Sequence, residues 1–345
     1  MASSPPDRAA PIRVAAGGHQ YDWVEDWAAL PDERDLRTGW AHHALVVSRD
    51  GEIIGIHPGA SQLVVLSASG QLIRTIDCDL VEGHGMCLVE VDGEERLWIA
   101  DCGVKMVPQA DAEAGYGVHV REHGGRVIEV RLTDGKVLRE LPVPAQDLYS
   151  ARPYFPTAVA VDPGNCIWVA DGYGASLLHR FDLDGRLTAT VTGEESGAGR
   201  LDCPHGLLID RRRREPELYV ADRENLRLLV FGLDGTFRRE VAKGGLGRPC
   251  AMATHGDLLV VAELRARVAL LDLDDRVIGY LGDNEAVADT PGWPNSVLDG
   301  KVVRQGSLAP GRFNSPHGLA VDAGGNLYVS EWLVGGRYTK LAAEG

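Results

Sequence analysis

The chain has 345 residues, of which 44% are hydrophobic, so it is long enough to bury a large core. It carries 50 acidic and 35 basic residues, a formal net charge of −15, which disfavours nucleic acid as a partner. No stretch has the apolar character of a secretory signal or of a membrane span, so we expect a cytoplasmic protein without a membrane partner. The six cysteines include no Cys-x-x-Cys pair and fit a reducing compartment.

The first residues differ from the rest of the chain. Residues 1–20 begin with a polar, Pro/Ala-rich stretch, and we predict a flexible N-terminal segment there. Residues 21–345 are predicted to form a single domain. Tyr21-Asp22-Trp23-Val24 is a candidate strand, and residues 42–76 contain four apolar runs separated by turns rich in Gly, Asp and Ser. Runs of this length predict one antiparallel four-stranded sheet.

This four-strand pattern occurs six times along the chain. The repeats start near residues 42, 83, 155, 203, 248 and 315. The sixth repeat ends before a fourth strand, and residues 21–24 could supply it and so close a ring. The sequence therefore predicts an all-β fold, a six-bladed β-propeller. Two stacked sandwiches would not explain so regular a repeat.

Two insertions interrupt the repeats. Residues 103–125 carry Tyr116, His119 and His123. His119 and His123 could cap one mouth of the propeller, but a mobile surface loop is the favoured interpretation. Residues 283–311 form a second long loop. The basic run Arg211–Arg214 falls between two predicted strands and is interpreted as a solvated hairpin tip.

The residue that starts the first strand of each blade should point into the central channel. These residues are His43 (or His42), His84, Thr157, His205, Cys250 and His317. The three clearest histidines, His84, His205 and His317, come from alternate blades and should converge on the axis. Three imidazoles suit a zinc ion with an open fourth position, although other divalent metals also accept imidazole. The alternative is that each histidine only starts its strand and bonds to the backbone.

The corners after the second strands should face the same mouth. Tyr173 follows Asp171-Gly172 and could act as a general acid or base, and Arg223 follows Asp222 and could bind an anion. The alternative is a structural corner in which Arg223 pairs with a neighbouring carboxylate. Acidic residues recur at the ends of the second strands, and recurrence favours a structural role in binding backbone N–H groups: Asp101, Asp171, Asp222, Glu263 and Glu331.

Several of these stretches resemble a known family. The blades are similar to NHL-type repeats, and Val169–Tyr173, Pro204–Leu207, Val220–Asn225 and Pro316–Gly318 resemble the peptidyl-α-hydroxyglycine α-amidating lyase family, over about residues 40–345. The resemblance implies a zinc-dependent lyase that acts on a small molecule. It also implies that His84, His205 and His317 are the zinc ligands, that Tyr173 is catalytic and that Arg223 is an active-site arginine.

The chain departs from the family pattern at two positions. Pro58 stands where the family has a second active-site arginine, and Gly318 stands where it has an aspartate associated with calcium. A calcium site is therefore not expected, and a small α-hydroxy amide is favoured over the family's peptide substrate. A non-catalytic NHL-type propeller that binds a protein partner is the alternative function, and a propeller hydrolase or lactonase ranks behind it. The sequence leaves the substrate, the native metal and the oligomeric state open.

Overall fold

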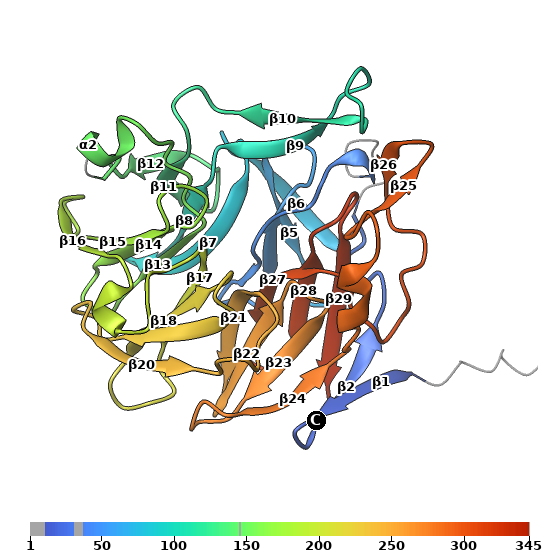
Figure 1. Ribbon diagram of the computed structural model, residues 1–345. Coiled ribbons are helices and arrows are strands. Elements are labelled where there is room, and N and C mark those ends of the chain that lie inside the picture. The colour runs from blue at the N-terminus through green and yellow to red at the C-terminus, as the bar shows by residue number, and fades with distance from the viewer. Residues whose placement is uncertain (1–10, 31–36, 145, 345) are drawn as a thin grey trace, which may run out of the picture.

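The computed structural model describes residues 11–30, 37–144 and 146–344, which fold into a six-bladed β-propeller (Figure 1). The first strands of the six blades, β3, β7, β13, β17, β21 and β27, contact one another in a closed ring around the axis. The predicted fold is confirmed.

Each blade is an antiparallel sheet whose strands run outward from the axis in chain order. Blade 1 contains β3 (Val46–Val47), β4 (Ile53–Ile56), β5 (Gln62–Leu66) and β6 (Leu72–Asp77). Blade 2 contains β7 (Gly83–Val91), β8 (Glu94–Asp101), β11 (Arg126–Arg131) and β12 (Val137–Glu140). Blade 3 contains β13 (Ala158–Val161), β14 (Ile167–Asp171), β15 (Leu177–Phe181) and β16 (Leu187–Val191).

The other three blades follow the same order. Blade 4 contains β17 (Pro204–Asp210), β18 (Glu217–Asp222), β19 (Arg227–Phe231) and β20 (Phe237–Val241). Blade 5 contains β21 (Pro249–His255), β22 (Leu258–Glu263), β23 (Arg267–Leu271) and β24 (Val277–Leu281). Blade 6 contains β27 (Pro316–Val321), β28 (Leu327–Glu331) and β29 (Arg337–Ala343), and is completed by β2 (His19–Val24) and β1 (Ile12–Ala16).

The hydrophobic core is divided among the six interfaces between neighbouring blades, one apolar cluster to each. The second strand of each blade is covered on both faces and consists largely of consecutive apolar residues, such as Ile167-Trp168-Val169-Ala170 in β14. The outer strands are covered on one face and alternate, as β16 does. Each large side chain buried in these interfaces contributes about 1.5–3 kcal/mol.

The N-terminal residues close the ring. β2 pairs with β29, so the prediction that residues 21–24 complete blade 6 is confirmed. The structure also differs from the predicted flexible segment 1–20, because Ile12–Ala16 forms β1 and pairs with β2 beside the last blade (Figure 1). Val14 and Trp23 are buried in the cluster between blades 5 and 6, which explains why this hairpin belongs to the domain. Residues 1–10 lie outside the described residues.

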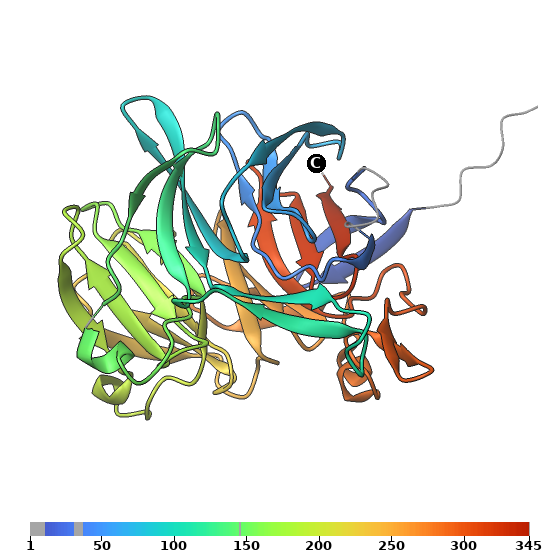
Figure 2. The same ribbon diagram turned by 90° about the horizontal axis from the view of Figure 1, so that it is seen from above.

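The two insertions have secondary structure of their own. Residues 103–125 contain the hairpin of β9 (Val104–Pro108) and β10 (Tyr116–Val120), so they are not a loop without structure. The second insertion contains a 3-10 helix (Glu285–Asp289) and the hairpin of β25 (Ser296–Leu298) and β26 (Lys301–Val303). The first hairpin reaches from blade 2 toward the second (Figures 1 and 2), and the amide of Val302 donates to the carbonyl of Ala114. The described residues also include the short helix α2 (Gln146–Tyr149) and a 3-10 turn (Glu194–Ser196).

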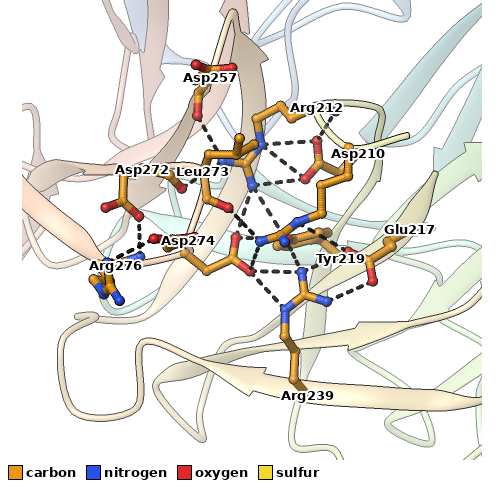
Figure 3. A network of polar contacts seen from close by, with 12 residues as sticks. Asp210, Arg212, Glu217, Tyr219, Arg239, Asp257, Asp272, Leu273, Asp274 and Arg276 are labelled. Atoms are coloured by element: carbon orange, nitrogen blue, oxygen red, sulfur yellow. Dashed lines mark hydrogen bonds and ion pairs between the residues drawn. The ribbon is translucent and has the colours of Figure 1, made fainter. Parts of the chain in front are cut away.

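The sequence predicted that the basic run Arg211–Arg214 is a solvated hairpin tip. Arg211 and Arg214 are exposed, but the prediction is wrong for Arg212. The side chain of Arg212 is 1% exposed and pairs with Asp210 at 2.9 Å and with Asp275 at 3.1 Å. Figure 3 shows Arg212 in a network that joins blades 4 and 5 and also includes Tyr219 and Arg239. The partner Asp275 lies on another blade, so local sequence did not indicate this burial.

Candidate functional site

Four histidines meet at one mouth of the axial channel. They are the three predicted residues, His84, His205 and His317, together with His42. One ligand atom from each imidazole lies within 4.8 Å of those of the others. The predicted convergence of histidines from blades 2, 4 and 6 is therefore what the structure shows. His43, the preferred sequence candidate in blade 1, instead lies near Tyr338, with its Nε2 3.3 Å from the phenol oxygen.

Local irregularities in the first strands place the three histidines. The pairing register shifts between Gly83 and Gly85, between Pro204 and Leu207, and between Pro316 and Gly318. Such bulges turn a side chain out of the normal alternation, here toward the axis. Each strand therefore presents its histidine to the channel mouth.

The glycine after each histidine is required by close packing of the first strands. A Cβ atom at Gly85 would lie 2.4 Å from the carbonyl oxygen of Thr157, and one at Gly206 would lie 2.3 Å from that of Cys250. At Gly318 the distance to the carbonyl oxygen of His43 would be 2.3 Å. A larger side chain such as aspartate would therefore not fit at position 318 with the backbone in this position.

Hydrogen bonds orient two of the imidazoles. Nδ1 of His84 donates to the carbonyl of Thr157 at 2.6 Å, and Nδ1 of His205 donates to that of Cys250 at 3.0 Å. A donor at Nδ1 leaves the Nε2 lone pair free, as in histidines that bind metals. Both ring nitrogens of His317 are buried without a hydrogen-bond partner of normal geometry among the described residues. The nearby carbonyl of His43 accepts a hydrogen bond from Ser330 Oγ.

The imidazoles are held in the neutral form. Burial lowers the pKa of His84 to about 3 and lowers the pKa values of His42, His205 and His317 well below the usual range. Neutral imidazole is the form that binds a metal ion. A set of neutral imidazole nitrogens fits zinc or another divalent transition metal better than calcium, which prefers oxygen ligands.

Tyr173 and Arg223 reach the same point, as predicted. The phenol oxygen of Tyr173 lies 3.0 Å from Nε2 of both His84 and His205, and Nη1 of Arg223 lies 3.2 Å from that oxygen. Burial raises the pKa of Tyr173 well above 10, although Arg223 opposes this shift, so the phenol is protonated in this state. Arg223 also pairs with Glu224 at 2.9 Å, which is the structural contact that the sequence left open.

The recurrent carboxylates are structural, as expected. Asp101 accepts hydrogen bonds from the amides of Val81 and Glu82, and Asp171 accepts one from the amide of Phe155. The carboxylates of Asp222, Glu263 and Glu331 likewise accept backbone N–H groups from the segment that enters their own blade. These buried contacts hold the corners that carry Tyr173 and Arg223.

The sequence did not single out two features beside the site. Lys105, on the β9 strand of the insertion, pairs with the buried Glu82 at 2.9 Å, and burial raises the pKa of Glu82 to about 7. Trp332 follows β28 and its ring centre lies 5.9 Å from that of His42. Lys105 gave no signal because it lies inside an insertion. Trp332 occupies the corner that Arg223 occupies in blade 4, so the repeat could have indicated it.

The insertions form part of the wall around His42. Tyr116 donates to the carbonyl of Thr38 at 2.7 Å and packs against Trp40. Trp40 and Trp293 both contact Trp332, which contacts His42. His119 and His123 are exposed and lie outside the histidine cluster, so they do not cap the mouth; the residue of this insertion that contributes to the wall is Tyr116.

The channel continues along the axis behind the histidines. It encloses about 410 Å³ and is lined by the first strands, with His84, His205 and His317 at one end. Arg211, which follows the far end of β17, lines it as well. Among residues 11–30, 37–144 and 146–344, no helix has the length and hydropathy needed to cross a membrane.

Comparison with known proteins gives distant relatives. No protein-family model matches the chain. Over 250 residues it is 28% identical to a probable peptidyl-alpha-hydroxyglycine alpha-amidating lyase of Caenorhabditis elegans, a match that covers 72% of this chain and 60% of that protein. The chain is similar to amidating lyases. It is also 29% identical over 186 residues to peptidyl-alpha-hydroxyglycine alpha-amidating lyase 2 of Drosophila melanogaster, which covers 51% of this chain and 39% of that protein.

Other matches concern the repeat and the fold. NHL repeat-containing protein 3 of Mus musculus is 25% identical over 211 residues, 59% of this chain and 55% of that protein. A streptogramin B lyase structure has a TM-score of 0.55 at 13% identity, and covers 94% of this chain and 98% of that one. A gluconolactonase from Xanthomonas campestris has a TM-score of 0.55 at 12% identity, and covers 100% of this chain and 99% of that one. At such identities the solved structures show the fold alone.

Proposed function

We propose that the protein is a metal-dependent lyase that cleaves the C–N bond of a small α-hydroxy amide. The observation that carries the proposal is the convergence of His84, His205 and His317 with Tyr173 and Arg223 at one axial point. The similarity to amidating lyases supports the same function. A propeller that only presents its loops to a protein partner has no need for several neutral imidazoles on its axis.

Three histidines of the propeller would hold the ion: His84, His205 and His317. When bound, zinc or another divalent metal would supply a Lewis acid that favours loss of the proton from the substrate hydroxyl. The buried carbonyls of Thr157 and Cys250 keep His84 and His205 turned toward the axis. Their bulged strands and the closely packed glycines make this arrangement rigid.

Tyr173 is proposed to carry the proton. In the reaction the hydroxyl loses its proton, the carbon–oxygen bond becomes a carbonyl, and the electron pair of the C–N bond leaves with the nitrogen, which gains a proton. A protonated Tyr173 can donate to the departing nitrogen and recover a proton from the hydroxyl, so the tyrosine ends as it began. The planar guanidinium of Arg223 would bind a carbonyl or carboxylate oxygen of the substrate.

The test is an assay of the zinc-loaded protein with an N-acyl α-hydroxyglycine. We expect a primary amide and a carbonyl product in equal amounts, formed faster than in the spontaneous breakdown of the same compound. The matched N-acyl glycine, which has no α-hydroxyl group, should stay intact. Cleavage of a sugar lactone without cleavage of the α-hydroxy amide would contradict the proposal and would favour a lactonase.

A further inference from the structure

His42 differs from the other three histidines in how it is held. His84, His205 and His317 lie on the first strands of their blades, whereas His42 lies on the segment before β3, outside any strand. The backbone on both sides is fixed, because the amide of Ala41 donates to the carbonyl of Leu333 and the amide of Ala44 donates to that of His84. The loop position of His42 is therefore defined by its neighbours.

The imidazole of His42 nevertheless reaches the centre of the cluster. Its ring centre lies 4.6 Å from that of His84 and 4.5 Å from that of His317. Its Nε2 lies 3.0 Å from the phenol oxygen of Tyr173, the same distance as Nε2 of His84 and of His205. Three ring nitrogens thus surround the phenol oxygen of Tyr173, and His42 supplies one of them.

The ring of His42 has no second anchor. Nδ1 of His84 and Nδ1 of His205 each donate to a backbone carbonyl, and such a bond keeps a metal-binding imidazole in place. Nδ1 of His42 makes no hydrogen bond among the residues that the structure describes, and its side chain is only half-buried. Its imidazole can therefore turn away from the axis without breaking a backbone contact.

We propose that His42 is a fourth, exchangeable metal ligand. With a metal ion bound, His42 would complete a set of four imidazole ligands. Such a set would leave no open position, which a catalytic tetrahedral zinc site requires. His42 would give way to the substrate, and its ring would turn toward Trp332. The proposal that His42 binds the metal does not depend on which reaction the protein catalyses. The exchange of His42 for substrate rests on the proposed function.

The first test counts the ligands in the wild-type protein. X-ray absorption of the zinc-loaded protein at rest should show four imidazole nitrogens at about 2.0–2.1 Å. Three imidazoles and one water oxygen would overturn the closed resting site. This measurement needs no variant and therefore does not depend on how well a substituted protein folds.

The second test uses His42→Ala, with His43→Gln as the neighbouring control. We expect the dissociation constant for zinc to rise at least about tenfold in His42→Ala, since even the loss of an outer-shell partner costs 10–100-fold. Azide, a small anionic ligand, should perturb the spectrum of the cobalt-substituted variant at lower concentration than that of the wild type. His43→Gln should match the wild type, because the His43 ring lies outside the cluster.

The outcomes separate the two proposals. Unchanged zinc affinity and unchanged azide response in His42→Ala would overturn the role of His42 while leaving a three-histidine metal centre and the proposed lyase in place. A wild-type protein that binds no zinc or cobalt would overturn both.

Discussion

Replacing Tyr173 with phenylalanine is expected to lower kcat by about 10²–10⁴-fold, the usual contribution of a positioned acid or base. The phenol oxygen lies among Nε2 of His84 and of His205 and Nη1 of Arg223, and no other hydroxyl is within hydrogen-bond distance of these atoms in the described residues. Phenylalanine keeps the ring that packs beside the imidazoles and removes only the oxygen. The metal content should therefore stay the same while turnover falls.

The control for this variant is Tyr280→Phe. Tyr280 lies on β24, the outer strand of blade 5, away from the axis that carries the histidine cluster. Its hydroxyl donates to the carbonyl of Gly245. It should retain wild-type kcat and metal content. If Tyr173→Phe turns over α-hydroxy amides at the wild-type rate, Tyr173 does not carry the proton.

Replacing Arg212 with alanine is expected to lower the free energy of unfolding by about 3–5 kcal/mol, because it leaves the buried carboxylate of Asp210 without its charged partner and weakens the network around Asp275. The side chains of Asp210 and Asp275 are 1% and 5% exposed, and Arg212 pairs with both. Its guanidinium also donates to the carbonyls of Asp257 and Asp272 (Figure 3). Denaturant unfolding monitored by circular dichroism measures the change.

Arg276→Ala is the matched control in the same region. Arg276 pairs with Asp274 at 2.9 Å, but the two side chains are 74% and 67% exposed. An exposed pair contributes about 0–1 kcal/mol, so this variant should unfold nearly as the wild type does. Equal, small losses in both variants would show that the buried network does not stabilise the junction of blades 4 and 5.

The repeated parts of the structure were predictable from the sequence. Apolar runs of strand length recur in six repeats, and each repeat needs its neighbours to bury its faces. The shared position of His84, His205 and His317 in these repeats was enough to predict their convergence. Tyr173 and Arg223 followed from their place after the second strands, where the structure has both side chains directed to the axis.

The parts that were missed depend on contacts between distant segments. In His42-His43, successive side chains of an extended segment point to opposite sides, so the sequence could not decide which imidazole reaches the axis. β1 is short and follows a polar, Pro/Ala-rich stretch, and it is stabilised by pairing with β2 and by covering blades 5 and 6. Lys105 and Arg212 have partners, Glu82 and Asp275, that lie outside their local sequence.

The most direct test of the axial metal centre is elemental analysis of protein purified without chelator, beside His84→Ala, His205→Ala and His317→Ala. We expect about one zinc, or another divalent transition metal, per wild-type chain, and loss of that metal in each variant while circular dichroism still shows the β-propeller. A wild-type protein that contains no metal, and takes up none when zinc is added, would contradict the metal centre and leave a non-catalytic binding propeller as the better account.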